Sequence, residues 1–396
     1  MSDAETEEKT EDNGESEGGA SRPSTGAGPV EELDESLLDG NMLITGFPGF
    51  IASRLLEEML AYNPEGRFYF LVEPRFRDRA RRRLEHIERD FPQFEEAWEI
   101  VEGDITDEYL GFGEETYEEM AETINVVWHL AAVYDLAVPE ALAYRVNVRG
   151  TIHVLDFCEK CTDLERFNYI STCYVSGERE GTVYEDELDE GQGHKNHYES
   201  TKFWAEVEVQ RRWMHIPTAI FRPGIVVGDS RTGETDKYDG PYFLFKLLKK
   251  LPDWMPVPNV GEGKPVVNLV PVDFVTEALA YVGLKQEASG QVYQLADPHP
   301  MRAKDIFALA IDCMDKAPPI GSVPASLADL ALRNERIESM FDMPREVLIY
   351  FNHGARYDSS NTQKALEGTD IHCPHLSTYM QTLVDYFLRH PEAPAA

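Results

Sequence analysis

The chain has 396 residues, 42% of them hydrophobic, which is enough to form a large core and excludes a wholly disordered protein. Its formal net charge is −35, and only part of it falls on the first 40 residues, which hold 13 acidic and two basic side chains. Because so negative a surface repels phosphate backbones and anionic lipid, we expect neither a nucleic-acid partner nor membrane insertion. A dispersed acidic excess also suggests a halophilic protein, with an ordinary acidic enzyme as the alternative.

Cysteine usage and apolar runs indicate the compartment. The five cysteines are an odd number without a paired framework, which favours a reducing environment. Cys158 and Cys161 form a CxxC pair inside an apolar helical pattern, with no second pair nearby, so we expect a structural role and no metal site. The chain has no run of 18 apolar residues, and its acidic N-terminus lacks the basic flank of a signal peptide. These features predict a cytoplasmic protein.

The first predicted segments are a tail followed by a regular alternation of strands and helices. Residues 1–39 are rich in Glu, Ser, Gly and Thr and nearly lack aromatic residues, so we expect a disordered acidic tail. Residues 40–225 alternate short apolar runs with segments of helical period, which predicts an α/β fold with a doubly wound parallel sheet, the Rossmann arrangement. We expect strands at 41–45, 67–72, 98–104, 125–132, 166–172 and 218–223, and helices at 50–62, 79–91, 139–161 and 198–214.

The alternation loosens after residue 225, where Gly and Pro clusters separate shorter helical segments. We therefore expect residues 226–396 to form mainly a smaller C-terminal lobe that binds the substrate. Within it, the apolar stripe at 242–255 could line an acyl-chain pocket, although core packing or a dimer face is the commoner explanation.

A glycine loop joins the first predicted strand to the first helix. Gly46 permits a tight turn, Gly49 lets backbone N–H groups approach a pyrophosphate, and Ala52 lets the helix pack closely on the strand. A purely structural turn is the alternative for such a motif taken alone. Its position in the first βαβ unit favours a dinucleotide site, whose expected contacts are Gly46, Pro48, Gly49, Phe50 and Ile51.

The end of the second predicted strand bears on the choice between NAD and NADP. Glu73 is placed to accept hydrogen bonds from the adenosine ribose and to repel a 2'-phosphate, which favours NAD. Arg75 and Arg77 follow directly and could bind that phosphate, so NADP stays open. The later arginines of this segment are best explained as a solvated helix face.

Two further strand ends supply expected cofactor contacts. Asp104 ends the third predicted strand and Ile105 follows it, where a carboxylate can reach the adenine. Leu130, Ala131 and Ala132 end the fourth predicted strand and provide a small-residue segment that we expect beside the nicotinamide ribose. Either segment alone would be an ordinary strand end, and the expectation depends on their order along the chain.

A tyrosine and a lysine stand four residues apart in a predicted helix. Tyr198 and Lys202 therefore share one helix face. Carbonyl reduction needs a proton donor, and a nearby positive charge lowers the pKa of a tyrosine from its ordinary value near 10. Ser171 and Thr172, at the end of a strand, offer a hydroxyl to hold the substrate oxygen. Alone, the pair could be an interfacial tyrosine and a surface lysine; together with the glycine loop it predicts a proton-transfer site.

These motifs together resemble the extended short-chain dehydrogenase/reductases. The ordered set TGxxGFIA, GDIT, HLAA, NVxGT, STCYVSG, YxxxK and RPG spans residues 41 to about 230, with weaker similarity to about 390. The resemblance implies that Tyr198 is the acid/base and that Lys202 holds the nicotinamide ribose and lowers the tyrosine pKa. Counting back from Gly177 makes Thr172, rather than Ser171, the match to the catalytic hydroxyl.

The same resemblance implies further contacts and a branch of the family. Asn147 would complete a proton relay, and Arg222 and Pro223 would contact the cofactor. The segments 167–188, 196–206 and 221–234 look most like fatty acyl-CoA reductases and thioester-reductase domains, the male-sterility type. That branch commonly has an arginine at the position of Glu73, so this chain departs from the branch at that residue.

The expected function is NAD(P)-dependent reduction of an acyl thioester or a related carbonyl. The substrate would be a small molecule such as an acyl-CoA, or an acyl group on a carrier protein presented in trans, and the enzyme could be a homodimer. One alternative is a nucleotide-sugar epimerase or dehydratase, which returns the hydride to its substrate. Another is a noncatalytic dinucleotide-binding protein, for which a broken YxxxK motif would be the indication.

Overall fold

The centre of the molecule is a seven-stranded parallel sheet with the strand order β11-β7-β5-β4-β1-β2-β3. The computed structural model describes residues 28–29, 32–134, 138–260, 263–324 and 353–392. The doubly wound α/β fold expected from the sequence is confirmed, and each of the six predicted strands is present. The strands are β1 Met42–Thr45, β2 Phe68–Val72, β3 Trp98–Glu102, β4 Val126–His129, β5 Arg166–Ile170, β7 Thr218–Pro223 and β11 Gln291–Leu295.

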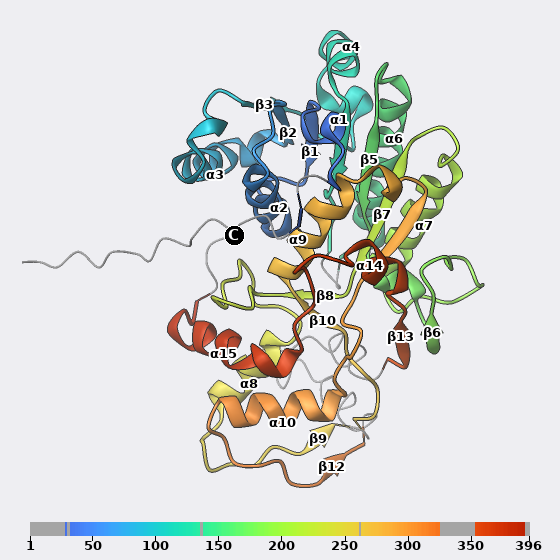
Figure 1. The fold of residues 1–396 in the computed structure, drawn as a ribbon. Helices are drawn as coiled ribbons and strands as arrows, with labels where there is room; N and C mark the ends of the chain where they lie inside the picture. The colour runs from blue at the N-terminus through green and yellow to red at the C-terminus, as the bar shows by residue number, and fades with distance from the viewer. Residues whose placement is uncertain (1–27, 30–31, 135–137, 261–262, 325–352, 393–396) are drawn as a thin grey trace, which may run out of the picture.

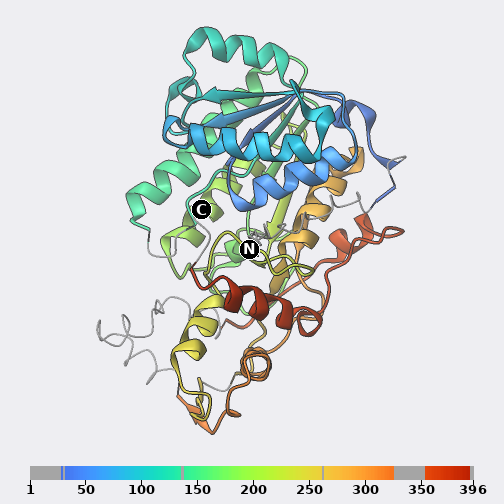
Figure 2. The same cartoon turned by 90° about the vertical axis from the view of Figure 1, so that its left-hand side faces the viewer.

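Helices cover both faces of this sheet (Figures 1 and 2). Successive residues of a strand point to opposite faces, so within β1 Ile44 packs into one core and Leu43 into the other. The first face carries α2 Phe50–Ala61, α3 Arg77–Asp90 and α9 Val272–Gly283; the second carries α4 Glu114–Thr123, α6 Thr151–Lys160 and α7 His197–Arg211.

The predicted helix at 139–161 is a composite element. It consists of α5 Glu140–Ala143, a π-helical turn η5 Tyr144–Gly150, and α6. A π turn inserts one residue into the helical ladder and is common at functional sites. Asn147 lies in this turn and is buried.

A smaller lobe lies beyond the carboxyl edge of the sheet (Figure 1). Its core contains α8 Tyr242–Lys250, whose buried residues Tyr242, Phe245 and Leu248 pack with α10 Ala303–Cys313 and α15 Met380–Arg389. The apolar stripe that begins at residue 242 thus serves core packing over the length of α8. The lobe also contains the strand pairs β8 Ile225–Val227 with β10 Leu269–Pro271, and β9 Asn259–Val260 with β12 Ser322–Val323. Helix α14 Ser360–Ala365 packs instead against β11 at the edge of the central sheet, and it follows β13 Ala355–Tyr357, which pairs with β6 Gly181–Val183.

Two predicted boundaries differ from the structure. The chain returns to the sheet after residue 225, because α9 packs on α2 and β11 pairs with β7, so no single cut separates the sheet from the lobe. The predicted tail also ends too late: α1 (Glu35–Leu38) is capped by Asp34, and Leu37 is fully buried. Leu37 and Leu38 are too few to change the acidic average composition of residues 1–39, so the composition did not indicate this helix. Residues 1–27 and 30–31 lie outside the described residues.

Within the part of the chain that the structure describes, every helix is too short or too polar to cross a membrane.

Candidate active site

The glycine loop lies where the strand order reverses, between β1 and β4, which is the usual ligand site of open α/β sheets. Gly46 has φ +85°, and a Cβ there would stand 2.7 Å from Ala131 N and 2.8 Å from Leu130 C. Gly49 caps α2 and places the helix N-terminus at the loop. The close backbone approach, the left-handed turn and the free helical N–H groups together fit a dinucleotide pyrophosphate.

Other expected cofactor contacts surround this loop. Phe50 and Ile51 begin α2, and the Arg79 guanidinium from α3 donates to Pro48 O at 3.2 Å. Ala131 N donates to Thr45 Oγ1 at 3.2 Å, which ties the segment after β4 to the end of β1. The structure thus brings together the loop and the Leu130–Ala132 segment from separate parts of the sequence.

At the end of β2, where we expect the adenosine, an acid and an arginine bind each other. Arg75 Nε lies 2.8 Å from Glu73 Oε2, and Arg75 Nη2 donates to Glu73 Oε1 at 2.9 Å. Arg77 Nε lies 3.0 Å from Glu102 Oε1. The residue that would repel a 2'-phosphate and the residue that would bind it therefore neutralise one another.

Asp104 and Ile105 follow β3 on the same edge. Asp104 Oδ1 accepts from Thr106 N at 2.8 Å, which closes the turn after the strand. Ile105 is buried, and its carbonyl lies 2.8 Å from His153 Nδ1 on α6. These contacts fix the backbone of the segment expected to meet the adenine.

The proposed catalytic hydroxyls meet at the end of β5. Thr172 follows the strand, and Tyr198 is the second residue of α7, whose N-terminus is capped by Asn196. Burial raises the pKa of Tyr198 to about 12, whereas a hydrogen bond with Thr172 lowers it. Tyr198 therefore keeps its proton at neutral pH. It is partly exposed, whereas Thr172 is buried.

Lys202 lies one helical turn after Tyr198 and is buried. Its Nζ donates to Tyr169 Oη at 3.0 Å and to Ile170 O at 2.8 Å. Burial lowers the pKa of Lys202 to about 7, and the Glu206 carboxylate acts in the opposite direction. The structure thus places the ammonium against β5, with contacts that the YxxxK spacing did not suggest.

Ser171 and Arg222 belong to one buried ion-pair group. Ser171 Oγ donates to Glu206 Oε2 at 2.5 Å, and Arg222 Nε donates to Glu206 Oε1 at 3.0 Å. Arg222 Nη1 also donates to Glu185 O at 3.3 Å. The Arg222 side chain therefore binds inside the protein, and its backbone carbonyl accepts from Cys173 Sγ at 2.9 Å. The cofactor contacts expected of Arg222 and Pro223 stay a prediction.

Asn147 holds the segment that follows β4. Its Oδ1 accepts from Val133 N at 2.8 Å, and its Nδ2 donates to Val133 O at 3.0 Å and to Thr201 Oγ1 at 3.0 Å. The amide thereby joins the π turn, the segment beside the expected nicotinamide position and α7.

Sequence reasoning missed the aromatic residues that approach the site from the C-terminal part of the chain. The ring of Tyr174 lies 5.9 Å from Tyr357 and 6.2 Å from His353. In the segment after β4, the exposed Tyr134 ring has its centre 4.1 Å from Lys237 Nζ. Strand β13 reaches the site by pairing with β6, a contact over more than 170 residues that no local pattern signals.

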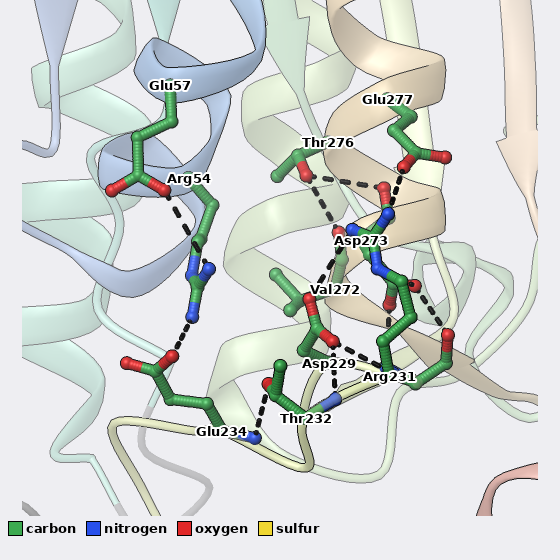
Figure 3. Close-up of polar contacts among 11 residues, drawn as sticks. Arg54, Glu57, Asp229, Arg231, Thr232, Glu234, Val272, Asp273, Thr276 and Glu277 are labelled. Atoms are coloured by element: carbon green, nitrogen blue, oxygen red, sulfur yellow. Dashed lines mark hydrogen bonds and ion pairs between the residues drawn. The ribbon is translucent and has the colours of Figure 1, made fainter. Parts of the chain in front are cut away.

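An ion-pair cluster connects the glycine-loop helix with the lobe (Figure 3). Arg54 of α2 binds Glu234, which lies in the segment after β8. Arg231 of the same segment lies 3.3 to 3.7 Å from three mostly buried carboxylates, Asp229, Asp273 and Glu277. Burial raises the pKa of Glu277 to about 7, although Arg231 acts to lower it. No group of three or more His, Cys, Asp or Glu side chains among the described residues is arranged to hold a metal ion.

A doubly wound sheet with a glycine loop at its switch point, followed by Thr172 and a YxxxK helix, is the arrangement of the extended short-chain dehydrogenase/reductases. The family model for the male sterility protein matches residues 44–279, and the chain belongs to this family.

Relatives and solved structures agree with this placement. The chain is 28% identical to fatty acyl-CoA reductase 1 of Gallus gallus over 64% of its length and 57% of that protein. It is 26% identical to the aldehyde reductase lnaA of Aspergillus flavus over 83% of its length and 34% of that protein. The terminal R domain of the myxalamid PKS-NRPS pathway superposes with a TM-score of 0.75 at 25% identity, covering 90% of this chain and 92% of that one. The chain spans less than two thirds of the length of the two curated relatives.

Proposed function

We propose that this protein reduces an acyl thioester, on coenzyme A or on a carrier protein presented in trans, to an aldehyde. The observation that carries the proposal is the hydrogen bond between Thr172 and Tyr198 at the sheet edge beside the glycine loop, in a chain of the male sterility family. The net reaction converts thioester, NAD(P)H and a proton into aldehyde, free thiol and NAD(P)⁺. A bound nicotinamide would supply the hydride.

Tyr198 is the general acid in this proposal. Its high pKa keeps it protonated, so it can donate to the carbonyl oxygen as negative charge develops there. Thr172 fixes that oxygen with a second hydrogen bond. Lys202, whose pKa is lowered by burial to about 7, would hold the ribose of a bound cofactor, and its charged form supplies the positive charge that makes proton transfer from Tyr198 easier. Asn147 keeps the segment after β4 in place and is the candidate for the end of a proton relay.

The cofactor site fits either NAD or NADP. Gly46, Gly49 and the N-terminus of α2 would hold the pyrophosphate, with Ala131 and Ala132 beside the nicotinamide ribose. Glu73 would bind the adenosine ribose of NAD, whereas Arg75 could turn from Glu73 to the 2'-phosphate of NADP. Residues from the segment after β8 onward would form the substrate side. A homodimer, a cytoplasmic location and a halophilic source remain predictions.

The test is a screen of NADH and NADPH oxidation with acyl-CoAs of several chain lengths, at low and high salt, for the wild type and Tyr198→Phe. We expect the variant to bind the cofactor normally and to lose turnover by at least about 100-fold, because a positioned proton donor contributes about that much. Tyr386→Phe, which removes a phenol from α15 in the lobe, is the matched control and should retain activity. Unchanged turnover of Tyr198→Phe would contradict the assignment.

The same screen separates the other candidates. A nucleotide-sugar epimerase would purify with tightly held NAD and convert its substrate with no net oxidation of NAD(P)H. A noncatalytic protein would bind the cofactor and turn over no thioester, aldehyde or nucleotide sugar.

A further inference from the structure

A row of polar side chains lies directly beneath the candidate active site. Thr45, His129 and Tyr169 are direct neighbours across β1, β4 and β5 in the register of the sheet. All three are buried, on the face that is covered by α6 and α7. The His129 and Tyr169 rings stack with their centres 5.8 Å apart. Polar groups in so buried a row must satisfy each other, because water does not reach them.

The hydrogens in this row can be assigned by counting donors and acceptors. Thr151 Oγ1 lies 2.7 Å from Asn147 O, and a carbonyl only accepts, so the Thr151 hydroxyl hydrogen is used there. Thr151 must therefore accept from its other two partners, His129 Nε2 at 3.0 Å and the Tyr169 hydroxyl. The neutral His129 then carries its hydrogen on Nε2.

The count continues to both ends of the row. With its hydrogen on Nε2, His129 accepts at Nδ1 from Thr45 Oγ1 at 2.8 Å. Thr45 Oγ1 in turn accepts from Ala131 N, in the segment that closes on the glycine loop. At the other end, the Tyr169 hydrogen points to Thr151, so its lone pair is left facing Lys202 Nζ at 3.0 Å. Each donor has one acceptor, which fixes the direction of every bond.

We propose that Tyr169 is a positioning residue that aims the Lys202 ammonium at the cofactor ribose and at Tyr198, and that Thr151 and His129 keep Tyr169 oriented for this role. An ammonium has three donors, and Tyr169 and Ile170 take two of them. The third donor is thereby directed to a ligand at the site. The inference rests on the role of Lys202 in the proposed function.

The groups around Lys202 determine how its pKa should change when the Tyr169 hydroxyl is removed. Burial lowers its pKa to about 7, the Glu206 carboxylate on α7 raises it, and the neutral His129 on β4 has its own pKa lowered by burial and by Lys202. Tyr169 from β5 stabilises the charged form by accepting a hydrogen bond, and its ring face lies 4.5 Å from Nζ. Loss of the Tyr169 hydroxyl should therefore lower the pKa of Lys202.

The experiment compares Tyr169→Phe with the wild type. The variant keeps the buried ring and removes the hydroxyl, and we expect about a tenfold loss of kcat and a severalfold weaker NADPH affinity. The alkaline limb of the pH profile should move to lower pH, because Lys202 loses its charge earlier. NADPH affinity is measured by fluorescence titration across pH, which needs no turnover. Tyr379→Phe, the same change at a buried tyrosine of the lobe, should alter neither quantity.

A second pair of variants keeps the proposal testable if Tyr169→Phe folds poorly. Thr151→Val removes the acceptor that orients Tyr169 and should shift the pH dependence of NADPH binding in the same direction. Thr151→Ser restores the hydroxyl and should restore the wild-type dependence. Wild-type pH profiles and affinities in Tyr169→Phe and Thr151→Val would overturn the inference. A wild type that binds NADPH but turns over no thioester would refute the proposed function, while the binding data would still decide the role of Tyr169.

Discussion

At the scale of single residues, neighbouring hydroxyls have different tasks. Ser171 and Thr172 are adjacent in sequence, but Ser171 donates to the buried Glu206, whereas Thr172 bonds to Tyr198. Adjacent residues at a strand end point to opposite sides, so only one of two such hydroxyls can face the ligand. This arrangement supports the assignment of the oxygen-binding role to Thr172.

Gly46 provides a prediction at this scale. Gly46→Ala would place a Cβ against the backbone of Leu130 and Ala131 at φ +85°, so we expect at least tenfold weaker NAD(P)H binding and a loss of about 1–3 kcal/mol in unfolding free energy. Gly290→Ala, with φ +73° and open space around its Cβ, is the control for backbone strain alone. Fluorescence titration and urea unfolding measure both effects. Wild-type cofactor affinity in Gly46→Ala would show that the close approach is unimportant.

The Glu73–Arg75 pair provides a second residue-scale prediction. Glu73→Ala should favour NADPH over NADH by about tenfold, because it removes a negative charge and frees Arg75 for the 2'-phosphate. Arg75→Ala should change the ratio in the opposite direction. The dissociation constants for the two cofactors provide the ratio, and Arg89→Ala in the last turn of α3 is the control. If neither Glu73→Ala nor Arg75→Ala changes the ratio, this pair does not select the cofactor.

Residue types and spacing indicated these candidates, but not their partners. The Tyr198–Lys202 spacing predicts a shared helix face, and both residues lie on α7. It could not predict that Lys202 binds Tyr169, because that contact depends on the packing of α7 against β5. The role of Tyr169 was hidden for the same reason, since a tyrosine in a buried strand has the pattern of an ordinary core residue.

At the scale of elements, the alternation of strands and helices was predictable because each strand is a short apolar run between turn residues. The exceptions have local causes. Residues 140–149, which include most of the π turn around Asn147, contain no Gly or Pro, so the sequence suggested one continuous helix. Strand β11 follows a stretch of irregular composition, and its membership of the sheet depends on pairing with β7 across about 70 residues.

The ion-pair cluster between α2, α9 and the segment after β8 gives a pH prediction (Figure 3). Glu277 has a folded-state pKa of about 7, above its ordinary value of 4.5, so the folded state holds its proton more tightly than the unfolded state. Its contribution to stability is therefore lost as pH rises between these two values, by on the order of 2–3 kcal/mol. Glu277→Gln should remove this loss and be more stable than the wild type at about pH 8.

Urea unfolding at about pH 5 and about pH 8 measures this effect. Glu118→Gln, at an exposed carboxylate of α4, is the control and should keep the pH dependence of the wild type. An equal pH dependence in Glu277→Gln and the wild type would mean that Glu277 does not carry the titration.

At the scale of the whole molecule, the net charge of −35 gives a prediction about salt. Repulsion among surface carboxylates destabilises the compact state, and salt screens it, with a Debye length of about 10 Å at 0.1 M and about 3 Å at 1 M. We expect the Tm to rise with KCl. A Tm that continues to rise into the molar range of KCl would indicate adaptation to high salt. A Tm that levels off below about 0.5 M KCl would indicate an ordinary acidic enzyme. Circular dichroism melts from low to molar KCl measure it, and a constant Tm would contradict the prediction.

At the same scale, the candidate site lies at the carboxyl edge of the sheet, where the glycine loop and the Thr172–Tyr198 pair are found. The central claim is that this site transfers a hydride to an acyl thioester. The most direct measurement is the stoichiometry of the reaction with an acyl-CoA, in which oxidised NAD(P)H, released thiol and aldehyde are quantified together. We predict one thiol and one aldehyde for each NAD(P)H, or two NAD(P)H for each thiol if the aldehyde is reduced further. Thiol release without NAD(P)H oxidation, or no thiol release with any acyl-CoA or carrier-bound acyl group, would contradict the account.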